Sequence, residues 1–432
     1  MNYKETLEYL YNSTPVFEHV GASAYKEGLQ NTLALDEHFG HPHRKFKTIH
    51  IAGTNGKGSC SHTIASILQK AGYKVGLYTS PHLVDFRERI KVNNMCISEK
   101  EVMDFVENER NFFEPLHPSF FELTTAMAFQ YFEKEHVDIA VIEVGLGGRL
   151  DCTNIITPIL SIITNISFDH TQFLGDTLEK IAAEKAGIIK HGVPVVIGEY
   201  NDETKSVFES RAKELEAPIT FAQDSNHILS SEAIENGGRR YTTPDGNSFV
   251  GELGGDYQEK NTGTVLEACH LLRGMGIIND EKHIFEGIRK VCSNTGLLGR
   301  WQKISERPLT ICDTGHNVAG WEYLSEQIKR QKCKTMRIVF GMVDDKDINS
   351  VMSLLPKDAE YYFTQAACKR ALNSHTVASI AESHRITGKA FVNVGEAYLQ
   401  ARKDADKDDF IFIGGSSYIV ADLLSFIAFN SF

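Results

Sequence analysis

The sequence predicts an α/β protein, in which a mostly parallel sheet domain with a glycine-rich phosphate loop precedes a smaller Rossmann-like α/β domain. Short β-branched runs alternate with helical patterns along most of the chain, which is typical of a parallel sheet covered by helices. One of these runs leads directly into a glycine-rich loop and then a helix. A length of 432 residues indicates two or three domains.

The expected elements of the first domain follow in order. The predicted strands are 47–52, 74–78, 138–143, 159–164 and 194–197, and the predicted helices between them include 58–71, 120–135 and 178–188. Residues 237–253 break the alternation, because the Asp245-Gly246 turn between alternating segments predicts a hairpin. A long helix over 258–275 follows.

A second alternating series begins near Pro308, with strands predicted at 309–312, 336–340, 360–363 and 410–413. The segment 293–299 contains two glycines and marks a change in charge balance, so we expect the hinge there. The predicted domains are 1–296, which contains the glycine-rich phosphate loop, and 297–432, the Rossmann-like domain at the carboxyl end.

Composition excludes several functions. The net charge is −12, and the first 296 residues carry 41 acidic and 28 basic residues, which argues against general nucleic-acid binding. The eight cysteines are scattered without a C-x-x-C pair, which suits a reducing compartment rather than a disulfide framework. The most apolar stretch, 410–429, is too polar in its middle for a membrane span. We expect a cytoplasmic, monomeric protein without membrane or nucleic-acid partners.

The strongest local signal is the segment I-H-I-A-G-T-N-G-K-G-S at 49–59. Glycines allow a close backbone approach, and the amides at the helix start point toward anionic oxygens. Lys57 would reach the outer phosphates, and Ser59 would offer a hydroxyl to magnesium. The segment departs from G-x-x-x-x-G-K-[ST], because Ile51 replaces the first glycine and Gly58 is inserted before the serine.

Three further residues have two interpretations each. Glu143 ends a predicted strand, so it suits either a magnesium ligand or a salt bridge. His170 follows a strand with Asp169 beside it, and could be a ligand or a structural hydrogen-bonding residue. Lys185 on its predicted helix could pair with the carboxylate of Glu184 or Glu179.

The loop sequence G-T-N-G-K-G-S at 53–59 resembles the phosphate loop of the folylpolyglutamate synthase and dihydrofolate synthase family, within the Mur ligase superfamily. Further motifs resemble that family in the same order along the chain. They are S-P-H-L at 80–83, F-E-L-T-T-A at 121–126, E-V-G-L-G-G-R-L-D at 143–151, D-H at 169–170, E-K-A-G-I at 184–188, Gln258, Asn261, Gly299-Arg300, D-T-G-H-N at 313–317, D-K-D at 345–347 and Gly415-Ser416.

The resemblance implies an ATP-dependent carboxylate–amine ligase that adds L-glutamate to dihydropteroate and folates through an acyl phosphate. It implies ATP, two magnesium ions and a carbamylated Lys185, with Lys57, Lys185 and His316 as the catalytic residues. The implied nucleotide site comprises Gly53, Thr54, Asn55, Gly56, Lys57, Gly58, Ser59, Gln258, Asn261, Arg300, Asp313 and His316. The implied metal ligands are Ser59, Ser80, Glu143 and His170, and the implied substrate contacts are Arg89, Phe120, Phe121 and Asp151.

The second domain departs from the family pattern. Asp313-Thr314-Gly315-His316-Asn317-Val318 stands where D-G-A-H-N-P is usual, and Tyr257-Gln258 replaces a usual histidine-glutamine pair. On its residues alone, His316 could simply start a helix.

We favour a bifunctional enzyme over a monofunctional folylpolyglutamate synthase. A Mur-type peptidoglycan ligase is disfavoured because about 46 residues precede the first predicted strand, too few for the extra amino-terminal domain of those enzymes. A phosphate-loop switch protein would not need the second metal site.

Overall fold

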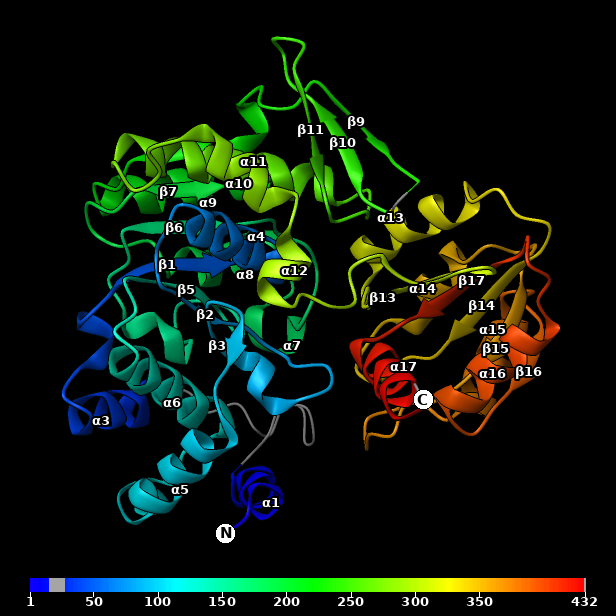
Figure 1. Cartoon of the computed structure of the whole chain (residues 1–432), viewed down its shortest axis with the longest axis horizontal. Coiled ribbons are helices and arrows are strands. Elements are labelled where there is room, and N and C mark those ends of the chain that lie inside the picture. Colours follow the sequence, from blue (N-terminus) through cyan, green and yellow to red (C-terminus); the bar gives the residue numbers. More distant parts are fainter. Residues whose placement is uncertain (15–27, 236, 431–432) are drawn as a thin grey trace. The chain divides into compact units, whose positions relative to one another are not determined.

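The computed structural model describes residues 1–14, 28–235 and 237–430, and it divides into two compact units (Figure 1). Unit 1 comprises 1–231, 241–251 and 258–296, and unit 2 comprises 232–240, 252–257 and 297–432. The sequence predicts a single domain boundary after residue 296, whereas unit 2 also includes the earlier segments 232–240 and 252–257.

Unit 1 contains an eight-stranded sheet, which confirms the predicted mostly parallel α/β fold. Its order is β4-β3-β2-β5-β1-β6-β7-β8, and only the β2–β3 and β3–β4 pairs are antiparallel. The strands are β1 (Lys47–Ala52), β2 (Val75–Tyr78), β3 (Ile90–Val92), β4 (Met95–Cys96), β5 (Ile139–Glu143), β6 (Leu160–Ile163), β7 (Val195–Ile197) and β8 (Ile219–Phe221). The sequence did not predict β3, β4 or β8, which have two or three residues each and lie at or next to the sheet edges.

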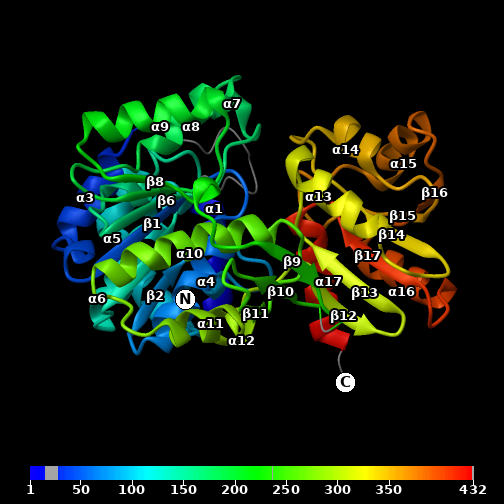
Figure 2. The ribbon, with the colours of Figure 1, turned by 90° about the horizontal axis from the view of Figure 1, so that it is seen from above.

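Helices cover both faces of this sheet, because alternate side chains of the buried central strands point to opposite sides. Leu77 and Val141 pack with α4, α10 and α11, whereas Tyr78 and Ile142 pack with α5 and α6 (Figure 2). The helices are α1 (Tyr3–Ser13), α3 (Gln30–His38), α4 (Lys57–Lys70), α5 (Glu99–Phe113), α6 (Phe120–Lys134), α7 (Thr171–Leu174), α8 (Leu178–Ala186), α9 (Asp202–Glu214), α10 (Gln258–Gly274), α11 (Glu281–Ile288) and α12 (Val291–Thr295). Short 3-10 helices lie at Pro42–Arg44, Phe86–Arg89, Glu114–Leu116, Cys152–Ile155 and Ala222–Asp224.

The predicted hairpin is present. Strands β10 (Arg239–Thr242) and β11 (Ser248–Gly251) flank the turn, where Gly246 has a φ of +84° that suits glycine. A third strand, β9 (Ser230–Ala233), completes a sheet in the order β11-β10-β9.

Unit 2 contains a six-stranded sheet in the order β12-β13-β17-β14-β15-β16, parallel except for the β12–β13 pair. Side chains of α13, α14 and α15 pack on one face around the buried Trp321 (Figure 2). The strands are β12 (Gln302–Glu306), β13 (Leu309–Asp313), β14 (Met336–Phe340), β15 (Glu360–Phe363), β16 (Gly388–Ala390) and β17 (Phe410–Gly414). The helices are α13 (Val318–Lys329), α14 (Ile348–Leu354), α15 (Ser374–Ser383), α16 (Val394–Asp404) and α17 (Ser417–Asn430).

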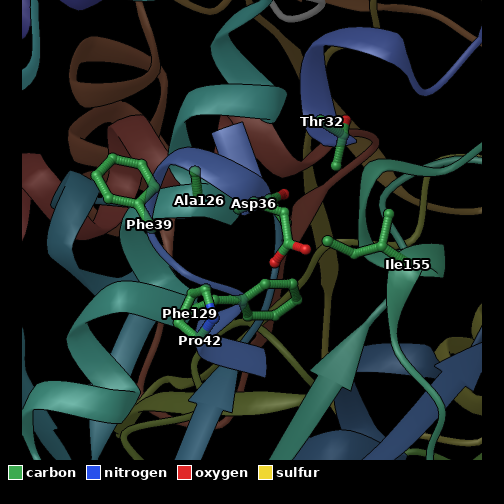
Figure 3. A pocket seen from close by; sticks show the side chains of 8 residues that line it. Thr32, Asp36, Phe39, Pro42, Ala126, Phe129 and Ile155 are labelled. Carbon is green, nitrogen blue, oxygen red and sulfur yellow. The ribbon is translucent and has the colours of Figure 1, made fainter. Parts of the chain in front are cut away.

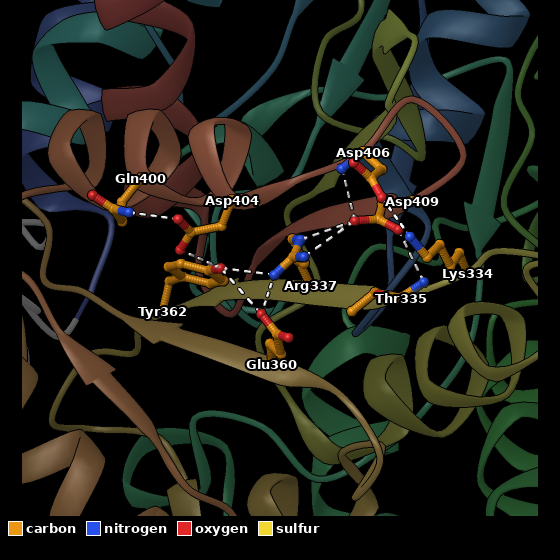
Figure 4. Close-up of polar contacts among 9 residues, drawn as sticks. All are labelled: Lys334, Thr335, Arg337, Glu360, Tyr362, Gln400, Asp404, Asp406 and Asp409. Carbon is orange, nitrogen blue, oxygen red and sulfur yellow. Dashed lines mark hydrogen bonds and ion pairs between the residues drawn. The ribbon is translucent and has the colours of Figure 1, made fainter.

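A network of charged side chains joins the amino ends of three strands in this sheet (Figure 4). The guanidinium of Arg337 on β14 is 7% exposed and lies 3.1 Å from the Asp409 carboxylate before β17, which is 2% exposed. Arg337 also pairs with Glu360 at the start of β15 and donates to the Tyr362 hydroxyl at 3.0 Å. The buried charge is therefore fully paired at the edge opposite to the loops that follow the strands.

Over the described part of the chain, every helix is too short or too polar to cross a membrane.

Candidate active site

The glycine-rich loop connects β1 to α4 at the carboxyl edge of the unit 1 sheet, where α/β proteins bind ligands. Gly53 and Gly56 have φ values of +147° and +83°, so L side chains would be strained at both positions. A Cβ at Gly53 would lie 1.8 Å from Thr164 Oγ1, and one at Gly56 would lie 2.3 Å from Asn261 Oδ1. The loop therefore needs both glycines, and the amino end of α4 is oriented to receive an anion.

The segment after β6 holds this loop in place. Thr54 Oγ1 donates to Ser167 O at 3.1 Å, and Asn55 N donates to Asn165 Oδ1 at 2.9 Å. Thr164 Oγ1 donates to Asn55 O at 2.5 Å. The sequence motifs do not include Thr164, Asn165 or Ser167, although a polar run that follows a predicted strand is a usable signal for such residues.

Gln258 and Asn261, at the start of α10, support the loop from the other side. Gln258 Nε2 donates to Ser59 Oγ at 3.1 Å, and Asn261 Nδ2 donates to Gln258 Oε1 at 3.0 Å. Both residues are buried, and the two contacts fix the Ser59 hydroxyl. Their direct contact with a nucleotide stays a prediction.

Two lysine amines converge on one backbone oxygen. Lys57 Nζ donates to Gly53 O at 3.0 Å, and Lys185 Nζ from α8 donates to the same oxygen at 2.9 Å. Burial and the nearby Lys57 charge lower the pKa of Lys185 to about 7. The Glu184 carboxylate, an expected alternative partner of Lys185, instead forms an ion pair with the Arg149 guanidinium at 2.8 Å. The structure thus holds a buried, readily neutralised amine beside the loop.

The predicted metal ligands lie at or after the carboxyl ends of strands β1, β2, β5 and β6. Glu143 ends β5, is 4% exposed, and accepts a hydrogen bond from Ser80 N at 3.3 Å. His170 precedes α7, with its Nε2 3.9 Å from Asp169 Oδ1. Over residues 1–14, 28–235 and 237–430, no three His, Cys, Asp or Glu side chains are close enough to hold a metal ion by themselves. The Glu143 carboxylate and the Ser59 and Ser80 hydroxyls are oxygen donors, which suit Mg²⁺, an ion that commonly takes one or two carboxylates and completes its shell with phosphates and water. The role of His170 as a ligand stays a prediction.

Asp151 holds its own loop together. Its carboxylate accepts hydrogen bonds from Gly145 N at 3.0 Å and Leu146 N at 2.9 Å, and from the backbone and hydroxyl of Thr153. Burial raises the pKa of Asp151, while these hydrogen bonds oppose that effect. The geometry gives Asp151 a supporting role beneath the glycines at 145–148, and its expected substrate contact stays a prediction.

The two adjacent phenylalanines of α6 differ in their surroundings. Phe120 is 3% exposed and packs against Tyr11 and Phe86, with the Arg89 guanidinium 5.1 Å from its ring centre. Arg89 is itself 2% exposed and donates to His82 Nδ1 at 2.8 Å. Phe121 is only partly buried and stacks on Tyr78, beside Gly145. Of the expected substrate contacts, Phe121 is the accessible ring, whereas Phe120 and Arg89 are core residues.

In unit 2, Asp313 ends β13 and organises the loop that follows. Its Oδ2 accepts hydrogen bonds from Tyr257 Oη at 2.6 Å and Trp301 N at 2.7 Å, and its Oδ1 accepts one from Gly315 N at 2.8 Å. Burial raises the pKa of Asp313, and the hydrogen bond from Tyr257 acts against this. The sequence marked Tyr257 only as a departure from the family pattern, and no motif pointed to Trp301.

The remaining predicted residues of unit 2, His316 and Arg300, both contact Thr314 of this loop. His316 Nδ1 is 3.1 Å from Thr314 O, and Arg300 contacts the Thr314 hydroxyl. Asn317 caps α13 by accepting a hydrogen bond from Gly320 N at 2.9 Å, so the helix starts without the family's usual proline.

An enclosed cavity elsewhere in unit 1 is not a substrate site. It lies between α3, α6 and Ile155, and Figure 3 shows the Asp36 carboxylate and the Phe129 ring beside it. Its volume is about 10 Å³, enough for one water molecule at most. The imidazoles of His41 and His43 each lie 2.6 Å from that carboxylate.

Comparison with known domains defines the class of protein. The Mur ligase middle domain matches residues 51–263, and the Mur ligase glutamate ligase domain matches residues 299–417. The phosphate loop and the two α/β units therefore belong to an ATP-dependent ligase of the Mur superfamily.

Full-length relatives narrow this class. Dihydrofolate synthase/folylpolyglutamate synthase of Bacillus subtilis is 32% identical over 415 residues, covering 92% of this chain and 94% of the relative. The enzyme of the same name from Escherichia coli is 33% identical over 390 residues, covering 87% and 86%. The chain belongs to the folylpolyglutamate synthase/dihydrofolate synthase family and is an ATP-dependent glutamate ligase, as the sequence motifs predicted.

Solved structures agree with this membership. E. coli FolC in complex with DHPP and ADP has a TM-score of 0.84 at 30% identity, covering 100% of this chain and 99% of that one. The Yersinia pestis bifunctional enzyme complexed with AMPPNP and Mn ion has a TM-score of 0.79 at 28% identity, covering 100% and 98%.

Proposed function

We propose that this single chain adds L-glutamate both to dihydropteroate and to reduced folates. The observation that carries the proposal is the glycine loop with its two converging amines, at the same sheet edge as Glu143 and Ser80. Relatives named for both activities span most of the chain, and E. coli FolC binds DHPP and ADP. A Lacticaseibacillus casei relative, 32% identical over 359 residues, is named for folylpolyglutamate synthase alone, so the monofunctional enzyme is the alternative.

The reaction has two steps. An oxygen of the substrate carboxylate attacks the γ-phosphorus of ATP, the bond to the β-phosphate oxygen breaks, and ADP leaves with an acyl phosphate formed. The deprotonated amine of glutamate then attacks the acyl carbon, the amide bond forms, and phosphate leaves. Negative charge accumulates on the transferred phosphoryl group, so positioned donors are the main requirement.

The residues of unit 1 suit that requirement. The amides at the start of α4 and the Lys57 ammonium would hold the phosphates, and Ser59, fixed by Gln258, would present its hydroxyl. Two Mg²⁺ ions, when bound, would neutralise phosphate charge. Ser59, Ser80, Glu143 and His170 would hold them.

We also propose that Lys185 is carbamylated. The neutral amine attacks the carbon of CO₂, which forms an N–C bond and releases a proton. The product carries an anionic oxygen, the ligand type that Mg²⁺ prefers. The position of Lys185 supports this, because carbamylation replaces one of two neighbouring positive charges at Gly53 O with a negative one.

In unit 2, we assign nucleotide contacts to Arg300, Asp313 and His316. Asp313 and His316 lie at the loop after β13, and Arg300, which precedes β12, contacts the Thr314 hydroxyl of that loop. We expect a cytoplasmic monomer to perform the reaction.

Phosphate release with different acceptors tests the substrate assignment. With ATP, Mg²⁺ and L-glutamate, we expect release with dihydropteroate and with tetrahydrofolate, but none with a UDP-muramyl peptide. Release with tetrahydrofolate alone would leave a monofunctional folylpolyglutamate synthase, and release with the muramyl peptide alone would overturn the proposal.

Lys57→Ala tests the phosphate loop. The loss of transition-state charge stabilisation should abolish measurable turnover while the melting temperature stays near that of the unchanged protein. Activity within about tenfold, equal to ~1.4 kcal/mol of barrier, would contradict the role of Lys57.

A further inference from the structure

The amino-terminal helix α1 lies outside both matched Mur ligase domains, yet it contacts the loop that carries Ser80. Leu10 anchors the helix in the core of unit 1. At the next residue of the helix, the Tyr11 ring stacks on the Phe120 ring with 5.3 Å between the ring centres. The Tyr11 hydroxyl lies 3.3 Å from His82 Nε2. His82 is two residues after Ser80, so α1 reaches the middle of the S-P-H-L loop.

Contacts on both ring nitrogens of His82 fix its orientation and tautomer. Arg89 Nε donates to His82 Nδ1 at 2.8 Å, and because an arginine Nε always carries its proton, Nδ1 must be the acceptor. The proton of the neutral imidazole is then on Nε2, which donates to the Tyr11 hydroxyl oxygen. The hydrogen bonds thus run in one direction, from Arg89 through His82 to Tyr11.

The two ends of the same loop are held by carboxylates. Ser80 N donates to Glu143 Oε2 at 3.3 Å. Farther along, the Glu88 carboxylate accepts hydrogen bonds from Leu83 N, Val84 N and Asp85 N at 2.8–2.9 Å. Between these two attachments, the His82 ring ties the loop to Tyr11 and Arg89.

We propose that Tyr11 is a positioning residue of the active site, which holds Ser80 in place through His82. The inference rests on the proposed role of Ser80 as a metal ligand. It assigns α1 a function in metal binding: when the middle of the loop is held, the Ser80 hydroxyl needs less ordering to coordinate Mg²⁺.

Tyr11→Phe removes the hydroxyl and keeps the ring on Phe120. The matched control is Tyr9→Phe, because Tyr9 is on the same helix and its hydroxyl donates to Glu114 at 2.7 Å, away from the loop. At saturating ATP and tetrahydrofolate, Tyr11→Phe should raise the Mg²⁺ concentration for half-maximal rate threefold to tenfold, the range of one lost neutral hydrogen bond. Tyr9→Phe should change it less than twofold, and both variants should melt near the temperature of the unchanged protein.

A double-mutant cycle tests whether Tyr11 acts through His82. In a His82→Ala background, Tyr11→Phe should have no further effect on the Mg²⁺ requirement. Equal Mg²⁺ requirements in Tyr11→Phe and Tyr9→Phe, or an undiminished Tyr11→Phe effect without His82, would overturn the inference. Ser80→Ala separates the two hypotheses, since an unchanged Mg²⁺ requirement there refutes the proposed role of Ser80 itself.

Discussion

Two buried cations of this protein have opposite surroundings. Arg337 in unit 2 is 7% exposed and is neutralised by Asp409 and Glu360 (Figure 4). Lys185 in unit 1 is 4% exposed, and its amine contacts a backbone carbonyl beside another lysine. No carboxylate of the described residues lies within ion-pair distance of Lys185.

The difference changes the protonation of each group. Although burial lowers the pKa of Arg337, its partners Tyr362, Glu360 and Asp409 hold it above the ordinary value. Burial and Lys57 lower the pKa of Lys185 to about 7. Removing a buried cation that has carboxylate partners leaves a buried charge unpaired and destabilises the fold, whereas a buried amine with a lowered pKa is typical of a functional site.

Of these two cations, Lys185 should have the larger effect on activity when it is replaced by arginine. Arginine keeps a positive charge but cannot form the carbamate, so ligase activity should fall at least about 100-fold, equal to ~2.7 kcal/mol of barrier. Lys185→Ala should be as inactive, and added formate or acetate should restore part of its activity. Steady-state phosphate release measures both variants.

Lys180→Arg is the matched control, because Lys180 is on the same helix and pairs with Asp176 at the surface. It should retain the activity of the unchanged protein. An active Lys185→Arg enzyme would show that Lys185 serves as a cation, like Arg337.

Arg337→Met should act on stability rather than on chemistry. It leaves the Asp409 carboxylate buried without its cation, which costs about 3–5 kcal/mol of unfolding free energy. Urea denaturation measures that loss, and the KM for ATP should stay unchanged while the protein is folded. The double variant Arg337→Met/Asp409→Asn should recover part of the lost unfolding free energy. If it recovers none, the unpaired Asp409 carboxylate is not the cause of the loss in Arg337→Met.

Reactivation by CO₂ should depend on pH in a way that reports the pKa of Lys185. After removal of CO₂ at low pH, the recovery rate at constant dissolved CO₂ should rise about tenfold from pH 6 to pH 8 and level off. The direction follows because only the neutral amine reacts, and its fraction saturates above a pKa of about 7. A rate that continues to rise tenfold per pH unit beyond pH 8 would indicate an ordinary lysine.

Tyr257→Phe should have the smallest effect. It removes one hydrogen bond to the buried Asp313 and should lower kcat/KM for ATP about tenfold, equal to ~1.4 kcal/mol. Tyr361→Phe is the control, because its hydroxyl donates to Pro356 O within the same unit. If both variants leave kcat/KM for ATP equal, Asp313 does not act on the nucleotide.

Local spacing made much of this protein predictable. The phosphate loop, the alternation of strands and helices along the chain and the position of Glu143 at a strand end follow from β-branched runs, glycines and helix starts that are close in sequence. Strands β1, β14 and β15 have the predicted bounds. Strands β3, β4 and β8 have two or three residues each and lie at or next to the sheet edges, so they carry little of the strand pattern.

What only the tertiary structure decided depends on contacts between distant residues. Phe120 and Phe121 are equivalent in sequence, but the packing of Tyr11 and Arg89 buries the first and leaves the second accessible. Residues 252–257 join unit 2 because Asp256 pairs with Arg239 and Arg330, an attachment no local pattern encodes. Sequence thus determined which chemical groups are present at each strand end, whereas long-range packing and burial determined which of them are free to react.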